Sequence, residues 1–168
     1  VEKLGLTQSL SGATIYINAA TTLSFFGREE EGLRLYDKAA ECYIRSDLTE
    51  TYEYAALLNN RAGTLNELKR YDEAEENWNE AIEILKKVGY HDGEIAISLV
   101  MLAHLTFDRD NTSYDKVEAL LDEAWAYLNS DNQAKDGNYA YVLRKCAPSF
   151  EYFQRPMEAQ ALRDVARE

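Results

Sequence analysis

Apolar residues recur along this chain at steps of three and four, the spacing that places them on one face of an α-helix. One such stripe is formed by Leu57, Leu58, Ala62, Leu65 and Leu68. After a turn at Lys69-Arg70, a second stripe is formed by Tyr71, Ala74, Trp78, Ala81, Ile82 and Leu85. Strand-like alternation does not compete with this pattern. The segment is therefore predicted to form two amphipathic helices joined by a turn.

Short junctions interrupt the helical pattern at a regular interval. Four tetrapeptides, spaced 42 residues apart, begin at Leu4, Ser46, Val88 and Ser130. Each contains Gly or Asp, residues that end a helix or cap the next one. In Asp47–Glu50 and Ser130–Gln133 a capping side chain precedes Glu or Gln by three residues, which predicts a capping box at both places. The chain is therefore predicted to contain four repeats.

Each repeat is interpreted as a pair of helices. The predicted helices are 11–26 and 29–45, 48–68 and 71–88, 92–108 and 114–129, and 136–153 and 156–168. The repeats span about 7–46, 49–88, 91–129 and 133–168, and residues 1–6 are predicted to be the tail of a preceding helix. Because one helix pair buries little of its own surface, neighbouring pairs must stack. We expect residues 1–168 to form a single repeat domain cut from a larger protein.

Composition and charge exclude several classes of partner. Of the 168 residues, 46% are hydrophobic and 29% are charged, which indicates a folded, soluble domain. The net charge of -12 would repel a phosphate backbone, so nucleic acid is not expected as a partner. The apolar runs are much shorter than the roughly 20 residues of a membrane-spanning helix, so no membrane partner is expected either.

The few residues with catalytic or metal-binding chemistry are scattered. Cys42 and Cys146 are far apart in the sequence, which favours buried, reduced thiols and a cytoplasmic location. His91 and His104 have no ligand or nucleophile at the spacing of a known motif. We therefore expect a protein that is not an enzyme and that has no cofactor and no metal site.

The second repeat carries the features of a known family. Its segments Asn60–Leu65, Lys69–Glu75 and Trp78–Ala81 resemble a tetratricopeptide repeat. The 42-residue period is similar to the longer repeats of kinesin light chains and related bacterial arrays. The resemblance implies an all-α fold, a right-handed α-solenoid of about four helix-turn-helix repeats.

The later repeats depart from this pattern. Tyr114–Val117 follows Tyr71–Ala74 by 43 residues, which predicts a longer turn between Asp108 and Ser113. The small residue at the helix contact is then either Ala103 or His104. Pro148 falls inside a predicted helix and should kink or end it, whereas Pro156 fits the first turn of the last helix.

The resemblance also implies a concave groove that receives a peptide or helix of a partner protein. In many family members an asparagine on the first helix binds the partner backbone, and Asn18 and Asn60 occupy that position here. The other candidate groove residues are Thr21, Ser24, Asn59, Asn66, Arg144 and Lys145, with Phe25 or Tyr152 as an aromatic alternative. The competing interpretation is that the asparagines bind neighbouring helices and that Arg144 and Lys145 are ordinary surface charges.

Three functions follow from this sequence. The first is a protein–protein interaction module that binds a peptide or helix of a partner in the groove. The second is a structural spacer, or self-association segment, of a longer repeat protein. A remote third is the peptide-sensing domain of a bacterial regulator. Other domains of a larger parent chain are expected in each case.

Overall fold

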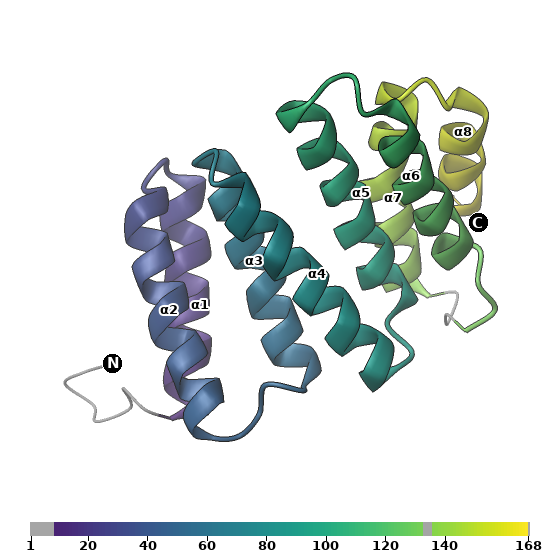
Figure 1. Ribbon diagram of the computed structural model, residues 1–168. Coiled ribbons are helices and arrows are strands. Elements are labelled where there is room, and N and C mark those ends of the chain that lie inside the picture. Colours follow the sequence, from purple (N-terminus) through teal and green to yellow (C-terminus); the bar gives the residue numbers. More distant parts are fainter. Residues whose placement is uncertain (1–8, 133–135, 168) are drawn as a thin grey trace. The chain divides into compact units, whose positions relative to one another are not determined.

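The computed structural model describes residues 9–132 and 136–167, and these ranges contain eight helices and no strand (Figure 1). The helices are α1 (Leu10–Phe25), α2 (Glu29–Arg45), α3 (Tyr52–Glu67), α4 (Tyr71–Val88), α5 (Asp92–Arg109), α6 (Tyr114–Leu128), α7 (Gly137–Tyr152) and α8 (Pro156–Val165). They divide into two compact units, one ending at Lys87 and one starting at Val88. The predicted helical tail 1–6, the junction at Leu4 and Gln133 lie outside the described residues. The eight predicted helices are confirmed.

The predicted capping box at Asp47–Glu50 is wrong, and α3 begins four residues later than expected. Asp47 has a left-handed backbone, with φ 56°, and lies in the turn after α2. The cap is Thr51, whose hydroxyl accepts a hydrogen bond from the Tyr54 N–H at 3.3 Å and donates one to the Leu48 carbonyl at 2.9 Å. A left-handed residue cannot also be the extended N-cap of a helix.

The predicted capping box at Ser130 is also wrong. The cap of α7 is Asp136, whose carboxylate accepts hydrogen bonds from the N–H groups of Asn138 and Tyr139 at 2.9 and 3.0 Å. Ser130 instead donates its hydroxyl hydrogen to the carboxylate of Asp92, at the start of α5. Its side chain therefore joins two segments of the second unit and does not cap α7.

The turns within three of the helix pairs have one geometry. A residue with a left-handed backbone follows the first helix, and it is Gly27, Lys69 or Gln154. The next residue is an arginine whose N–H bonds a carbonyl five residues earlier, in the pairs Arg28–Leu23, Arg70–Leu65 and Arg155–Phe150, at 2.9, 2.9 and 2.8 Å. This is the Schellman arrangement, which satisfies carbonyl groups at a helix end.

The third helix pair uses a different and longer turn, as its sequence predicts. Helix α5 ends at Arg109, and the Asp110 carboxylate accepts hydrogen bonds from the Thr112 N–H, the Thr112 hydroxyl and the Ser113 hydroxyl at 3.0, 2.7 and 2.7 Å. These bonds lower the pKa of Asp110 to about 2. The carboxylate therefore organises the residues that lengthen this turn.

Two uncertainties of the sequence are resolved by the described helices. Ala103 is fully buried, as are Ala20 and Ala62, so the small-residue position of α5 is Ala103 and not His104. Pro148 does not end α7, which continues to Tyr152. Pro148 and Arg144 are both exposed. Water can therefore bond the Arg144 carbonyl that loses its helical partner.

The first helix pair packs closely at a small residue of α2. A Cβ atom added to Gly32 would lie 2.7 Å from the Ser24 hydroxyl oxygen and 3.0 Å from the Ala20 carbonyl oxygen. The second atom belongs to the backbone of α1 and cannot rotate away. Gly32 therefore allows α1 and α2 to approach more closely than any other residue would.

We predict that Gly32→Ala lowers the free energy of unfolding by about 1–3 kcal/mol, because α1 and α2 must separate. Gly63→Ala is the matched control, since Gly63 also lies inside a helix but has open space around its Cβ position. It should raise stability by about 0.5–1 kcal/mol through helix propensity. Urea unfolding followed by circular dichroism measures both. Equal effects of the two substitutions would contradict the close packing at Gly32.

Candidate functional site

Helices α1 and α3 carry most of the predicted binding residues, and polar side chains connect them. The Ser24 and Thr64 hydroxyl oxygens lie 3.0 Å apart and form a hydrogen bond between the two helices. The Thr21 hydroxyl lies 2.9 Å from the Tyr36 hydroxyl, which ties α1 to α2. Thr21 and Ser24 are therefore already engaged in contacts within the first unit.

Asn18 and Asn60 differ from these residues. Each lies two positions before a fully buried alanine, Ala20 or Ala62, so the two occupy the same position on their helices. Both side chains are exposed, and in the described part of the chain neither amide has a hydrogen-bond partner. Each amide can therefore both donate to and accept from another molecule.

The other two asparagines predicted for the groove are less accessible than Asn18 and Asn60. Asn59 and Asn66 are half-buried. The Asn66 side-chain oxygen is buried and accepts no hydrogen bond from the described residues. At the end of α1, Phe25 is exposed and its ring contacts that of Phe26 edge to face, with 5.4 Å between the centroids.

Arg144 and Lys145 lie on α7 in the second unit, and both cations have partners. The Arg144 guanidinium donates a hydrogen bond to the Ala166 carbonyl at 3.1 Å. Ala166 is the C-cap of α8, where a cation also stabilises the helix dipole. The Lys145 ammonium lies over the Tyr141 ring, 5.8 Å from its centroid. These contacts give both residues a role in unit 2 itself.

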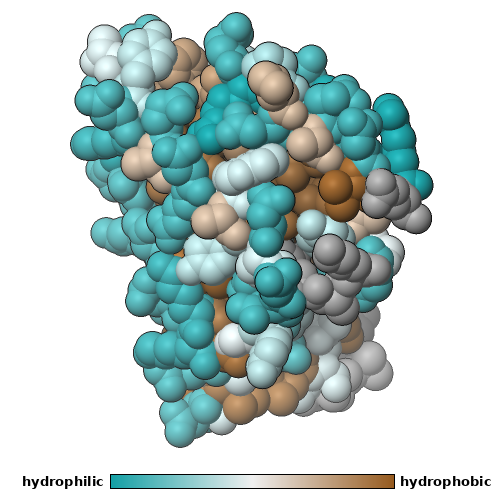
Figure 2. Space-filling model, turned by 90° about the vertical axis from the view of Figure 1, so that its right-hand side faces the viewer, coloured by the Kyte–Doolittle hydropathy of each residue, from teal (hydrophilic) through white to brown (hydrophobic). Residues whose placement is uncertain are grey.

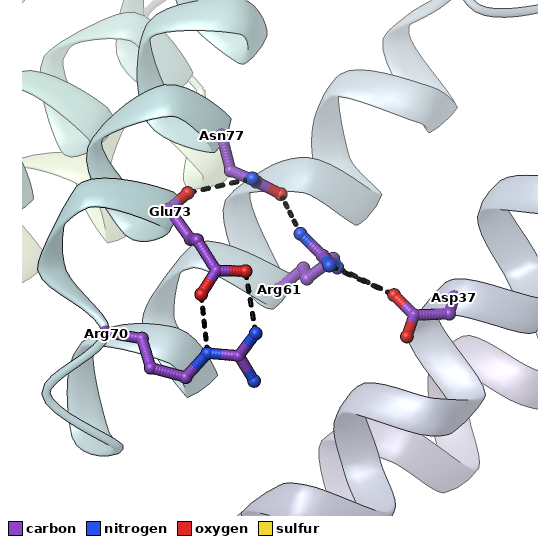
Figure 3. A network of polar contacts seen from close by, with 5 residues as sticks. All are labelled: Asp37, Arg61, Arg70, Glu73 and Asn77. Carbon is purple, nitrogen blue, oxygen red and sulfur yellow. Dashed lines mark hydrogen bonds and ion pairs between the residues drawn. The ribbon is translucent and has the colours of Figure 1, made fainter.

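A polar network in the first unit was not predicted from the sequence (Figure 3). Arg61 of α3 donates hydrogen bonds to the Asp37 carboxylate of α2 at 3.1 Å and to the Asn77 side chain of α4 at 3.0 Å. Asn77 in turn donates to the Glu73 carbonyl at 2.9 Å. The Arg61 side chain is 21% exposed, and Asn77 is 8% exposed. Arg61 therefore holds three helices together from a largely buried position.

The turn arginines form a second set of ion pairs that was missed. Each one pairs with a glutamate three residues later, in the pairs Arg28–Glu31, Arg70–Glu73 and Arg155–Glu158. In Arg70–Glu73, two parallel hydrogen bonds of 2.7 Å join the groups (Figure 3), and the carboxylate raises the pKa of Arg70. The recurrence of Arg-x-x-Glu in three turns is visible in the sequence and could have identified these pairs.

We predict that Arg61→Ala lowers the free energy of unfolding by about 1–3 kcal/mol, because the buried Asn77 oxygen loses its donor. Arg70→Ala is the control, since the Arg70 and Glu73 side chains are 40% and 45% exposed. An ion pair this exposed should cost at most about 1 kcal/mol. Chemical unfolding of both variants tests the difference. A larger loss in Arg70→Ala would show that the network is not the main link.

His104 is half-buried in the second unit and has a structural environment. Its Nε2 atom lies 2.9 Å from the Ser149 hydroxyl, and its ring lies 5.3 and 4.8 Å from the rings of Tyr152 and Phe153. Burial lowers the pKa of His104 below 6.5. The Cys42 and Cys146 thiols are buried as well, and burial raises the pKa of Cys146 to about 12.

The lowered pKa of His104 predicts that the chain loses stability in acid. Below pH 6.5 the unfolded chain binds a proton at His104 more readily than the folded chain does, so the free energy of unfolding falls as the pH drops through that region. His104→Gln should flatten this part of the pH profile. Melting temperatures between pH 7.5 and 5.5 provide the test. An unaltered slope in His104→Gln would exclude this assignment.

Hydrophilic side chains cover most of the face drawn in Figure 2. None of the described helices has the length and apolar character needed to cross a membrane. Within the described ranges, no group of three His, Cys, Asp or Glu side chains could hold a metal ion.

Known proteins similar to this chain share its helical repeats. The family model of the tetratricopeptide repeat matches residues 53–130. Among solved structures, the chain is similar to BtubC (BKLC) from P. vanneervenii, with a TM-score of 0.66 and 19% identity over 92% of this chain and 61% of that chain. No curated protein sequence gives a match.

A second similar structure is that of a protein described as a kinesin light chain with nearly identical TPR-like repeats, from Podosopora anserina. Its TM-score is 0.61 and its identity is 16%, over 92% of this chain and 73% of that chain. Tetratricopeptide repeats are typically non-catalytic and commonly serve as interaction or scaffold modules. Residues 53–130 of the chain therefore match the tetratricopeptide repeat family, and the eight described helices have the fold of TPR-like repeat proteins.

Proposed function

We propose that this chain is a protein–protein interaction module that binds a peptide or helix of a partner through the face carrying Asn18 and Asn60. The observation that supports the proposal is that both amides are exposed and without a partner among the described residues. Their neighbours Thr21 and Ser24 bind within the unit and keep α1 and α3 in place. The helices of this face are therefore held in place, while the Asn18 and Asn60 amides can bind a partner.

An amide is suited to binding a backbone because its two polar groups match a peptide N–H and carbonyl. Two such amides, 42 residues apart on helices joined by the Ser24–Thr64 bond, could contact one extended or helical segment. These contacts would contribute affinity with little dependence on the partner's side chains. Sequence selection would then come from other residues of the face, such as the exposed Phe25.

The second candidate is a scaffold role, in which the repeats space or join parts of a longer protein. The tetratricopeptide repeat family matched at residues 53–130 commonly serves as a scaffold as well as an interaction module, which supports this candidate. In that case Asn18 and Asn60 would be dispensable for every interaction of the chain. We also propose a cytoplasmic location, because the chain has two cysteines and both are buried as thiols.

We predict that the double substitution Asn18→Ala, Asn60→Ala weakens partner binding about tenfold or more, through the loss of about 0.5–1.5 kcal/mol per hydrogen bond. Its melting temperature should stay nearly unchanged, since neither amide bonds the described chain. The measurement is quantitative affinity capture from a cell lysate, followed by titration of the captured protein against both forms.

The control is Asn79→Ala with Asn111→Ala, which removes two exposed amides from other positions. It should capture the same protein with unchanged affinity. Equal capture by all three forms would favour the scaffold role. A large loss of stability in the Asn18, Asn60 variant would show that these residues serve the fold.

A further inference from the structure

A hollow with a volume of about 430 Å³ opens in the second unit, where the end of α5, the start of α6 and the end of α7 meet. Its lining includes four aromatic rings, Phe107, Tyr114, Tyr152 and Phe153, together with Val117 and Glu118. We call it the aromatic hollow. Its volume lies within the range of small-ligand sites and is sufficient for a long side chain. It belongs to the second unit, whereas the α1–α3 face belongs to the first, and it does not depend on the function proposed above.

The rings of the aromatic hollow contact one another but are not closed off from solvent. The Phe107 centroid lies 6.2 Å from that of Tyr114, 6.1 Å from that of Tyr152 and 5.7 Å from that of Phe153. Tyr114 and Tyr152 are nevertheless 62% and 56% exposed. Aromatic rings that remain accessible in a hollow attract cations through the negative charge of their faces.

The negative charge of Glu118 beside the rings also favours a cation. Glu118 is the only charged residue in the described lining, and its side chain is 54% exposed. Among the described residues its ion-pair partner is Arg155, which lies 3.6 Å away and also pairs with Asp122 at 2.8 Å and with Glu158. Three carboxylates therefore share one cation. The Glu118 carboxylate keeps the capacity to bind a second cation.

Helix α6 adds to this negative potential. Its sequence contains four carboxylates and one lysine, and the whole chain has a net charge of -12. A purely apolar ligand would remove water from Glu118 without replacing it, which is unfavourable. An anionic ligand would be repelled. A cation with an apolar stem satisfies both the rings and the carboxylate.

We propose that the aromatic hollow binds an arginine side chain from a basic segment of a partner protein. A guanidinium group is planar, so it can stack on a ring of the hollow while its N–H groups donate to Glu118. Lysine can supply the charge but not the stacking plane. The order of affinity is therefore arginine, then lysine, then any neutral side chain.

The test uses the 168-residue chain and short acetylated peptides of glycine and serine with one central arginine, lysine, citrulline or phenylalanine. Citrulline keeps the shape of arginine and lacks its charge. Binding is followed by NMR of the aromatic ring signals of Phe107, Tyr114 and Tyr152. The arginine peptide should shift these signals in a saturable way, with an affinity several-fold to about tenfold above that of citrulline.

Two variants locate the effect. Glu118→Gln should reduce arginine binding to the level of citrulline, whereas Glu123→Gln removes the same charge from an exposed position of α6 outside the lining and should change affinity less than about twofold. Tyr114→Leu removes a largely exposed ring and should also weaken binding. Melting curves verify that each variant is folded.

Three results would overturn the proposal. The first is equal affinity for the arginine and citrulline peptides. The second is a higher affinity for the phenylalanine peptide together with no effect of Glu118→Gln. The third is the absence of a saturable shift of the ring signals with any peptide. The first two would make the hollow an apolar anchor site. The third would make it a packing defect without a ligand. None of the three bears on Asn18 or Asn60.

Discussion

The close approach of helices at residues without large side chains is the constraint on which the other features depend. At Gly32, a single added carbon would meet the backbone of α1. The fully buried Ala20, Ala62 and Ala103 mark the corresponding positions of α1, α3 and α5. Because these positions cannot rotate or slide without a clash, they fix which residues of each first helix remain exposed. Asn18 and Asn60 are exposed because each lies two residues before such an alanine.

Polar contacts then connect helices that packing has already placed. In the first unit, Arg61 joins α2, α3 and α4 through Asp37 and Asn77. In three turns an arginine follows a left-handed residue and pairs with a glutamate, so that the turn and the start of the second helix are stabilised together. In the turn between α5 and α6, the Asp110 carboxylate organises the residues instead. That difference places Phe107 and Tyr114 on either side of a longer connection, where they line the aromatic hollow.

The sequence predicted the helices well because burial imposes a period of three to four residues on every one of them. The predicted capping boxes at Asp47 and Ser130 were wrong, because a four-residue capping motif does not fix the conformation or the hydrogen-bond partner of its first residue. Asp47 has a left-handed backbone, and the Ser130 hydroxyl bonds Asp92. The Arg61 network joins residues 24 and 16 positions apart, and helical periodicity carries no information on such pairs. The accessibility of Asn18 and Asn60 could not be predicted, because the sequence is equally compatible with contacts between these asparagines and neighbouring helices.

The central claim is that the face carrying Asn18 and Asn60 binds a segment of another protein through its side-chain amides. The most direct measurement is ¹⁵N NMR of these two amide groups while a captured partner is added. The account predicts that both signals shift together, and that their hydrogens exchange more slowly with water in the complex. Unchanged Asn18 and Asn60 signals, together with shifts elsewhere on the chain, would contradict it.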